Sequence, residues 1–341
     1  MVSTDHKSLI DVANLSVKFH TRDFVISAVE NISFSIQKNE ILALVGESGS
    51  GKSVTALSLL RLNELSNGYI SSGKIFFSPD DETQYDLSSA DNKVMQQVRG
   101  NEISMIFQEP MTSLNPVLSV GEQISEVLRL HQKMSVNSAW KRAEDLLDAV
   151  NIPDPKRRVH DYPFQMSGGQ RQRVMIAMAL ACEPKILIAD EPTTALDVTV
   201  QAQIFGLLKD LQTKTGTSII LITHDMGAVA QMARKMIVMY AGRPCEIGEV
   251  AQVIKTPQHP YTTGLISCVP HLDDAIIDAN NRLSEIPGIV PSLREFGSNK
   301  CLFASRCKHQ MEQCRAERPV MAQFSNKQAF ACWKREIIDA G

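Results

Sequence analysis

Eight glycine-rich residues, GESGSGKS (46–53), follow the apolar run ILALV (41–45) and precede a helix-patterned segment. In this order of strand, loop and helix, glycines let backbone N–H groups turn inward around phosphate oxygens, and the helix start adds partial positive charge. The pattern predicts a phosphate-binding loop in which Lys52 reaches the terminal phosphates of a nucleotide and Ser53 ligates Mg²⁺. The small residues expected to line this loop are Gly46, Ser48, Gly49 and Gly51.

Two acidic residues, Asp190 and Glu191, stand directly after the apolar run KILIA (185–189). Sheets of parallel strands bind their ligands at the carboxyl ends of the strands. Asp190 is therefore suited to hold Mg²⁺, directly or through water, and Glu191 to polarise an attacking water as general base. An isolated Asp-Glu pair belongs more often to a solvated loop, but the phosphate loop in the same chain favours the catalytic interpretation.

Two further polar residues end apolar strands in the same way. Gln108 closes ISMIFQ (103–108), and His224 follows SIILIT (218–223). A lone Gln or His at a strand end is usually structural and satisfied by a neighbouring backbone group. Their shared placement in a nucleotide-binding sheet makes both residues candidates for contacting the attacking water, the metal ion and the γ-phosphate.

The segment MSGGQRQR (166–173) predicts a second anion-binding helix start. Ser167, Gly168 and Gly169 stand before a helix-patterned stretch, QRQRVMIAMALA (170–181), so backbone donors are open there. A single nucleotide already has its phosphate loop at 46–53. This second helix start is therefore best interpreted as a cap that one subunit supplies to another subunit's nucleotide.

The elements that must position these residues can be predicted from hydrophobic spacing. Alternating apolar residues in NLSVKF (14–19) and NISFSI (31–36) indicate antiparallel strands. Short, unbroken apolar runs are typical of strands buried on both faces, and helix-patterned segments lie between them, which predicts a parallel sheet wrapped by helices. These runs occupy residues 41–45, 185–189, 218–223 and 235–240.

The strand pattern disappears between about 109 and 165, where GEQISEVLRLHQ and SAWKRAEDLLDAV have helical spacing. An inserted helical subdomain is expected there. From about Thr256 onward prolines become frequent, which indicates a boundary. The sequence thus predicts an ATPase-like domain over 1–255 and a C-terminal extension over 256–341.

Composition narrows the class of protein. The 341 residues are 43% hydrophobic and 21% charged, a balance typical of globular proteins. A formal net charge of −3 gives no global basic field, so we expect no nucleic-acid partner. The apolar runs are shorter than the roughly 20 residues that cross a bilayer. The N-terminus lacks the pattern of an export signal, and seven cysteines without one point to a reducing compartment.

Taken together, GESGSGKS, Gln108, MSGGQ, ILIADE, TALD and THD, in this order and spacing, resemble the ATP-binding subunit of an ABC transporter over about residues 11–255. The resemblance implies an α/β P-loop NTPase fold with an antiparallel β subdomain, a helical subdomain and a C-terminal extension. It also implies a head-to-tail dimer in which two ATP molecules lie between one subunit's phosphate loop and the other's signature sequence. The signature residues that would contact ATP are Ser167, Gly168, Gly169 and Gln170.

The resemblance gives roles to four more residues. Phe19 would stack on adenine, and Asp197 would cross the dimer interface. Gln108 would be the Q-loop residue that contacts Mg²⁺, and His224 would be the switch histidine. With Glu191 and His224 both present, the sequence gives no reason to expect a degenerate half-site.

More distinctive stretches indicate the branch of the family. FQEPMTSLNPVLSVGEQI (107–124), HPYTTGLISCVP (259–270) and IPGIVPSL (286–293) resemble the oligopeptide, dipeptide and nickel importers of bacteria, most closely the first ATPase subunit of a dipeptide or oligopeptide permease. The resemblance implies a heterodimer with a second, homologous ATPase, two membrane-spanning permeases and an extracytoplasmic solute-binding protein. The chain would then lie on the cytoplasmic face of the inner membrane, and the segment after Gln108 would dock a permease.

The expected function is hydrolysis of ATP that powers the import of di- or oligopeptides. Nickel chelates, glutathione, antimicrobial peptides or polyamines are alternative cargoes for the same machinery. A soluble ABC-type ATPase of DNA repair or translation is the alternative from another class. Such proteins usually carry two ATPase cassettes or a long coiled-coil insertion, and neither is present in the sequence.

Four cysteines gather near the C-terminus: Cys301, Cys307, Cys314 and Cys332. Their spacing lacks the tight pairs common in structural zinc sites, and a reducing compartment argues against disulfides. Four thiolates can bind an iron-sulfur cluster, and the basic residues Arg306, Lys308 and Arg315 are expected to favour deprotonated sulfur. Zinc or unrelated buried thiols are the alternatives. The resemblance to peptide-importer ATPases, some of which hold a 4Fe-4S cluster in this extension, favours iron-sulfur.

Overall fold

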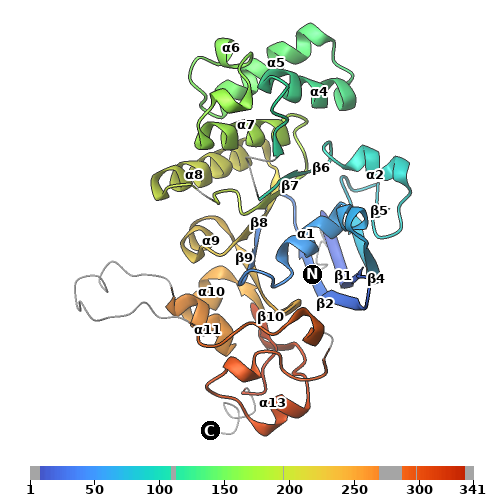
Figure 1. Ribbon diagram of the computed structural model, residues 1–341, viewed down its shortest axis with the longest axis vertical. Helices are drawn as coiled ribbons and strands as arrows, with labels where there is room; N and C mark the ends of the chain where they lie inside the picture. Colours follow the sequence, from blue (N-terminus) through green and yellow to red (C-terminus); the bar gives the residue numbers. More distant parts are fainter. Residues whose placement is uncertain (1–7, 109–112, 195, 269–285, 297, 335–341) are drawn as a thin grey trace, which may run out of the picture. The chain divides into compact units, whose positions relative to one another are not determined.

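The computed structural model describes residues 8–108, 113–194, 196–268, 286–296 and 298–334 (Figure 1). The chain divides into two compact units, each assembled from separate stretches of the sequence. The first comprises Met1–Ile10, Ser35–Ile41 and Phe76–Ile222, and the second comprises Asp11–Phe34, Leu42–Ile75 and Thr223–Gly341. The phosphate loop therefore belongs to the second unit, whereas Asp190, Glu191 and the MSGGQ signature belong to the first.

The first unit contains three parallel strands, β6 (Ile103–Ile106), β7 (Ile186–Asp190) and β8 (Ser218–Thr223). β7 pairs with β6 on one side and with β8 on the other. Every residue of β7 and β8 is buried, as the unbroken apolar runs predict for strands covered on both faces. A short strand, β5 (Tyr85–Asp86), pairs antiparallel with the end of β4 (Gly68–Phe77).

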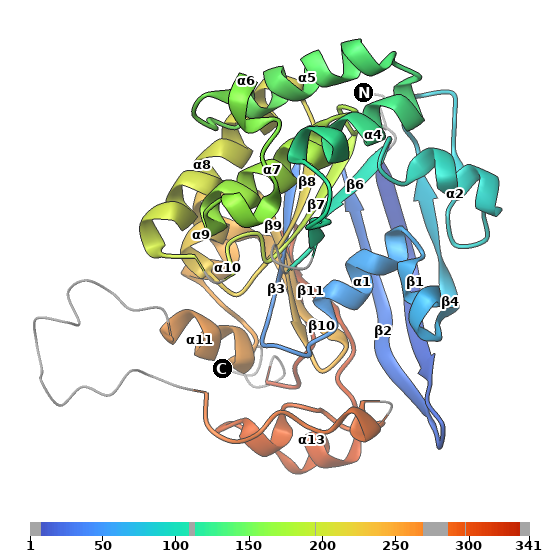
Figure 2. The same cartoon turned by 45° about the horizontal axis from the view of Figure 1, so that its top comes forward.

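The remaining elements of the first unit are α2 (Asn92–Val98), α4 (Val120–Gln132), α5 (Val136–Ala149), α6 (Pro155–Arg158), η2 (Pro163–Gln165), α7 (Gly168–Leu180) and α8 (Val198–Thr215). In α4, Val120, Ile124 and Leu128 recur at helical spacing and are fully buried, which explains why this segment folds as an amphipathic helix. Ser119 caps the same helix by accepting a hydrogen bond from the Glu122 N–H (3.2 Å). The described part of the predicted helical region, 113–165, contains helices and no strand, and residues 109–112 lie outside the described residues (Figure 2).

In the second unit, β1 (Ile10–His20) lies between β2 (Val25–Ile36) and β4, and these strands form the antiparallel β subdomain. A second set of strands is ordered β11 (Ala322–Ser325), β12 (Gln328–Phe330), β10 (Arg243–Glu249), β9 (Lys235–Tyr240) and β3 (Ile41–Val45). β3 and β9 run parallel, and β10, β12 and β11 follow antiparallel. The sequence pattern did not predict β11 and β12, because strands of four and three residues are too short to show an alternation.

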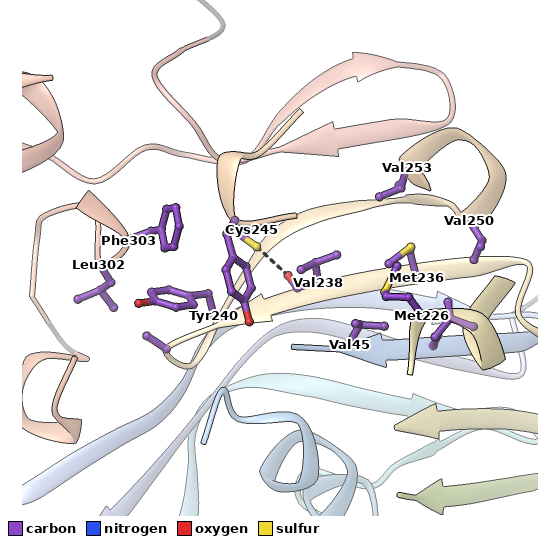
Figure 3. Packing of buried hydrophobic residues seen from close by; sticks show 14 of the residues in the cluster. Val45, Met226, Met236, Val238, Tyr240, Cys245, Val250, Val253, Leu302 and Phe303 are labelled. Atoms are coloured by element: carbon purple, nitrogen blue, oxygen red, sulfur yellow. Dashed lines mark hydrogen bonds between the residues drawn. The ribbon is translucent and has the colours of Figure 1, made fainter. Parts of the chain in front are cut away.

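The helical segments of the second unit are α1 (Lys52–Leu59), η1 (Leu62–Ser66), α9 (Met226–Met232), α10 (Val250–Lys255), α11 (Pro260–Ser267), η3 (Leu293–Glu295), η4 (Ala304–Arg306) and α13 (Glu312–Ala316). Val45, Met236 and Val238 of the sheet share one buried cluster with Leu302 and Phe303 (Figure 3). The cysteine-rich extension is thus packed into the same core as the strand that precedes the phosphate loop.

Candidate nucleotide site

The phosphate loop begins where β3 ends, and its shape requires glycine at two positions. Gly46 has φ 151°, and a Cβ on it would lie 2.2 Å from the carbonyl oxygen of Met239. Gly51 has φ 98°, and a Cβ there would lie 2.9 Å from the carbonyl oxygen of Ala28. Any larger residue would clash with main chain at both places, so the close packing of the loop against its neighbours depends on these glycines.

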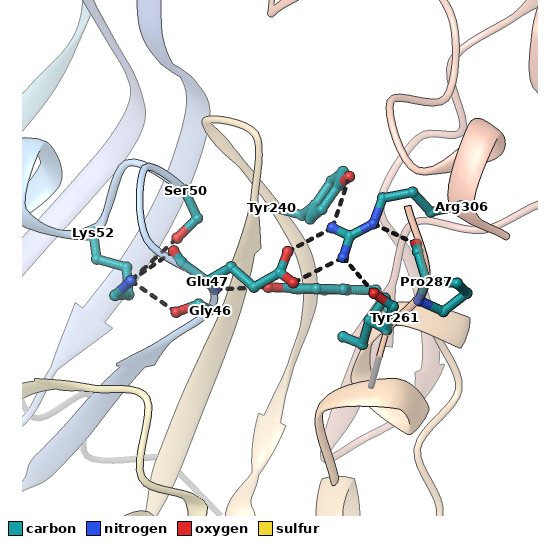
Figure 4. Close-up of polar contacts among 9 residues, drawn as sticks. Gly46, Glu47, Ser50, Lys52, Tyr240, Tyr261, Pro287 and Arg306 are labelled. Carbon is teal, nitrogen blue, oxygen red and sulfur yellow. Dashed lines mark hydrogen bonds and ion pairs between the residues drawn. The ribbon is translucent and has the colours of Figure 1, made fainter. Parts of the chain in front are cut away.

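Lys52 is buried, with 5% of its surface exposed, at the first position of α1. Its Nζ donates hydrogen bonds to the carbonyl oxygens of Gly46 (2.8 Å) and Glu47 (2.9 Å) and approaches the Ser50 Oγ (3.4 Å) (Figure 4). The ammonium group is therefore held by the loop that it follows. Ser53, the predicted Mg²⁺ ligand, is the next residue of α1. No side chain caps this helix at Gly51, so the N–H groups at its start can bind an anion.

The structure brings together Gln108 and Glu191, which the sequence placed only at the ends of separate strands. The Gln108 Nε2 donates to the Glu191 Oε2 (3.0 Å), and the Thr194 Oγ1 donates to the same oxygen (3.1 Å). Two donors therefore orient the carboxylate of the proposed base. Asp190, the residue before it, is buried at the end of β7.

Glu191 also has a strained backbone. Its φ is 44°, a left-handed conformation that non-glycine residues rarely adopt, and its N–H donates to the Ile222 carbonyl (2.9 Å). Strain of this kind costs on the order of 1–3 kcal/mol and concentrates at functional sites. Thr194 begins the TALD motif, but the sequence did not predict its contact with Glu191, because the turn that joins the two residues shows only in the structure.

The signature sequence forms the exposed start of α7, as predicted. Ser167 and Gly168 are exposed, and Met166 before them is buried. The Ser167 Oγ accepts the Gln170 N–H (3.3 Å), and the Gln170 Oε1 accepts the Ser167 N–H (3.1 Å), which together make a capping box. Gly169 leaves little room beside it, since a Cβ there would lie 3.1 Å from Val200. The capped start of the 13-residue helix α7 therefore faces solvent.

The remaining residues predicted to contact the nucleotide are divided between the two units. In the first, Asp197 caps α8 by accepting the Val200 N–H (3.0 Å), and Ala195 of the TALD motif lies outside the described residues. In the second, Phe19 is half-buried at the end of β1, where its ring packs against Gly68. His224 is exposed, just before the residue that caps α9.

The four C-terminal cysteines lie within electrostatic reach of one another. Burial, together with the smaller effect of the charges of Cys314, Cys332 and Cys307, raises the pKa of the Cys301 thiol to about 11. The Cys301 N–H also donates to the Cys314 carbonyl (2.9 Å). Four sulfurs are the donor type that an iron-sulfur cluster takes. Within the described ranges, no group of three or more His, Cys, Asp and Glu is arranged to hold a metal ion.

The expected effect of a basic neighbour is present at Cys307, where Lys308 lowers the thiol pKa, but the net direction of the pKa shift is the opposite of the expected one. Burial raises the pKa of both Cys307 and Cys332, and this outweighs the opposing effect of Lys308 on Cys307. Arg306 faces a different partner, because its guanidinium makes two hydrogen bonds to the carboxylate of Glu47. Sequence proximity to a cysteine therefore did not predict the direction in which this side chain points.

His259, in the HPY stretch, predicts that the folded protein loses stability in acid. The ring is buried, its Nδ1 accepts the Tyr261 N–H (3.1 Å), and burial lowers its pKa from 6.5 to about 4. Between these values the unfolded chain binds a proton that the folded chain does not. Stability should therefore fall by up to about 3 kcal/mol as the pH falls from 6.5 to 4.

Thermal or urea unfolding of the full chain across this pH range measures the effect, with His259→Asn as the matched control. Asparagine keeps an oxygen acceptor for the Tyr261 N–H but does not titrate. The variant should lose less stability on acidification than the original chain. Equal losses in the two proteins would show that His259 does not carry the effect.

Comparisons with known proteins agree with these observations. A family model described as ABC transporter matches residues 29–194, and one described as oligopeptide/dipeptide transporter, C-terminal region, matches residues 245–314. A "Putative peptide import ATP-binding protein" of Brucella melitensis is 46% identical over 334 residues, which cover 97% of this chain and 98% of that protein. A second protein so described, from the same organism, is 50% identical over 323 residues, or 94% and 93% of the two chains.

Solved structures show the same likeness. A dimeric ATP-binding cassette in a post-hydrolysis state, bound to ADP and Pi, matches with a TM-score of 0.62 and 28% identity over 71% of this chain and 98% of its own. Part of an ABC transporter complex from Clostridium perfringens matches with a TM-score of 0.60 and 27% identity over 73% and 92%. None of the helices in the described ranges combines the length and the apolar character needed to cross a membrane.

Proposed function

We propose that this chain, which belongs to the ABC transporter family as an ATP-hydrolysing subunit, powers the import of di- and oligopeptides. Its fold class is the predicted one, an α/β P-loop ATPase with an antiparallel β subdomain and the C-terminal region of this family. The proposal of a peptide cargo rests on the match of residues 245–314 to the oligopeptide/dipeptide transporter C-terminal region. Relatives described as peptide importers, similar over nearly their whole length, support it.

In the mechanism that we propose, Lys52 and the amides of the phosphate loop bind the β- and γ-phosphates of ATP. Ser53, Asp190 and Gln108 would hold the Mg²⁺ that neutralises phosphate charge. Glu191, oriented by Gln108 and Thr194, accepts a proton from the attacking water. The left-handed backbone of Glu191 supports this role, since strained backbone positions concentrate at functional sites.

The proposed site is completed by a second ATPase subunit. The exposed helix start at Ser167, with Gly168, Gly169 and Gln170, would contact the γ-phosphate of the partner's ATP, and Asp197 would cross the interface. Within this chain, Phe19 would stack on adenine and His224 would contact the γ-phosphate. Binding of two ATP molecules closes the dimer, the closure moves the permeases, and hydrolysis reopens it.

The partners that we propose follow from the family. They are a second, homologous ATPase forming a heterodimer, two membrane-spanning permeases and an extracytoplasmic solute-binding protein. The chain would then be peripheral, on the cytoplasmic face of a bacterial inner membrane. The permease would dock after Gln108, where residues 109–112 lie outside the described part of the chain.

The cargo class can be tested on the importer reconstituted with its permeases and solute-binding protein in vesicles. ATP turnover should rise when dipeptides or oligopeptides are supplied to the binding protein. Nickel chelates, glutathione, antimicrobial peptides and polyamines serve as the comparison set, because they are the alternative cargoes of this machinery. Stimulation by one of those compounds, with none by peptides, would replace the proposed cargo and leave the ATPase function intact.

We further propose that Cys301, Cys307, Cys314 and Cys332 hold a 4Fe-4S cluster. The support is the electrostatic proximity of the four thiols and the main-chain bond between Cys301 and Cys314. Such a cluster, when bound, supplies a covalent cross-link and a redox centre. The thiol protons must leave on binding, and the raised pKa values of Cys301, Cys307 and Cys332 make that release the pH-dependent part of assembly.

The full chain, purified without oxygen, should contain about four iron atoms and show visible absorption. Replacing Cys314 by serine should abolish both, whereas Cys182→Ser should preserve them, because Cys182 lies in the other unit. Metal analysis and absorption spectra check this. Stoichiometric zinc in a colourless protein, or a protein without either metal, would contradict the proposal.

A further inference from the structure

One residue of the phosphate loop, Glu47, is bound at its side chain and its N–H by the C-terminal part of the second unit and at its carbonyl by Lys52. The carboxylate of Glu47 accepts two hydrogen bonds from the Arg306 guanidinium, at 2.6 and 2.9 Å. The Glu47 N–H donates to the Tyr261 Oη (2.7 Å). The Glu47 carbonyl accepts from the Lys52 Nζ (2.9 Å) (Figure 4). The amide, carbonyl and side chain of Glu47 are thus all hydrogen-bonded. The partners of the amide and of the side chain lie more than 200 positions away in the sequence.

The groups that hold Glu47 are themselves fixed. Only 3% of the Arg306 side chain is exposed, and it also donates to the carbonyls of Pro287 (2.9 Å) and Ile286 (3.1 Å). Tyr261 is fully buried, and its ring packs against those of Tyr240 (4.7 Å) and Phe303 (5.4 Å between centroids). A bidentate Arg-carboxylate pair has a defined geometry, and a buried one is costly to break because the remaining charge is left unpaired.

We propose that Arg306 and Tyr261 are positioning residues for the ATP site, so that the C-terminal extension sets the affinity of the phosphate loop for nucleotide. They act through Glu47, since its carbonyl binds the Lys52 ammonium and its neighbours supply the loop amides. The inference rests on the proposed contact between Lys52 and phosphate and does not depend on the cargo.

The same contacts connect the cysteine region to the phosphate loop. Arg306 ends the turn η4, which lies between Cys301 and Cys307, so its backbone is shared with the cysteine region. Gly288 allows Arg306 to lie close, because a Cβ there, at φ 83°, would be 3.1 Å from the Arg306 Cγ. A rearrangement of the cysteine region would thereby change the position of Glu47 and the affinity for ATP.

The experiment compares Arg306→Gln with Arg318→Gln in the full chain. Arg318 is the matched control, because it is another C-terminal arginine that pairs with a glutamate, Glu30 (2.6 Å), which is not part of the phosphate loop. ATP affinity is measured by calorimetry with Mg-ATP, and stability by thermal unfolding. Arg306→Gln should raise the Kd for ATP about tenfold, which corresponds to ~1.4 kcal/mol. Arg318→Gln should leave the Kd unchanged, whatever its effect on stability.

A double-mutant cycle separates positioning from a general loss of structure. Glu47→Gln keeps the shape of the side chain and should weaken ATP binding by a similar factor. The double variant with Arg306→Gln should then bind ATP no worse than the weaker single variant, because both changes remove one interaction. Tyr261→Phe, which removes only the acceptor of the Glu47 N–H, gives a third variant if Arg306→Gln does not fold.

Two results would overturn the inference. One is an ATP Kd for Arg306→Gln, or for Glu47→Gln and Tyr261→Phe, that equals the Kd of Arg318→Gln. The other is strict additivity in the cycle. Both leave the proposed function standing, provided that the original chain binds ATP. An original chain that fails to bind ATP would overturn both proposals, so the two failures are distinguishable.

Discussion

Replacing Glu191 by glutamine is expected to lower ATP turnover by about 10²–10⁴-fold, the range that general-base catalysis contributes, while ATP affinity stays the same. Glutamine has the same shape, and its amide oxygen can still accept from Gln108 and Thr194. It cannot take a proton from water. Phosphate release by the assembled ATPase, together with nucleotide binding, measures the two quantities separately.

Thr194→Val is the graded control for this prediction. It removes one donor to the Glu191 Oε2 but leaves the carboxylate, so turnover should fall by only about tenfold. Turnover retained in the Glu191→Gln protein would show that another group is the base. A loss of ATP binding in that protein would show that Glu191 contributes to the binding of ATP instead of to its hydrolysis.

Replacing Gly46 by alanine is expected to abolish ATP binding and to lower the free energy of unfolding by about 3 kcal/mol, as overpacking of a rigid site does. The added Cβ would lie 2.2 Å from the Met239 carbonyl oxygen and 2.8 Å from the Ser50 Oγ. Because the first of these is main chain of β9, the clash cannot be relieved by a rotamer change. The phosphate loop would have to move instead.

Gly49→Ala provides the matched control. Gly49 also has a positive φ, 75°, but no atom lies within 4 Å of a Cβ built there. Gly49→Ala should lower the free energy of unfolding by about 1 kcal/mol only, the cost of placing alanine in a left-handed backbone conformation. Urea unfolding of the two variants and of the original chain tests the difference. If the two alanine variants were equally stable, close packing at Gly46 would not explain the loop's conformation.

Much of the site could be predicted because its signals are local. The apolar runs ending at Val45, Ala189 and Thr223 specify buried strands within a few residues, and the observed strands β3, β7 and β8 end within one residue of these positions. The cap at Ser167 is equally local, since Gln170, which it binds, is three positions away. The glycine-rich motif is also local in the sequence, although the atoms that require glycine at 46 and 51 belong to the distant residues Met239 and Ala28. Strand ends in a parallel sheet are then brought together by the fold, which is how Gln108 meets Glu191.

The contacts that could not be predicted join distant parts of the chain. Glu47 and Arg306 are 259 positions apart, and neither position differs in its local pattern from a solvated charge. The sequence placed Arg306 beside Cys307 and suggested a role in thiol chemistry, but the side chain turns to the phosphate loop. The pKa of a cysteine likewise depends on burial, which spacing alone does not give, and so the direction expected for Cys307 was wrong.

ATP hydrolysis by this chain is expected to drive peptide import. Uptake of a labelled tripeptide tests it most directly, in cells that produce the complete importer with either the original chain or the Glu191→Gln protein. Uptake is expected with the original chain and none above background with Glu191→Gln, although both proteins assemble and bind ATP. Equal uptake in the two strains would contradict it.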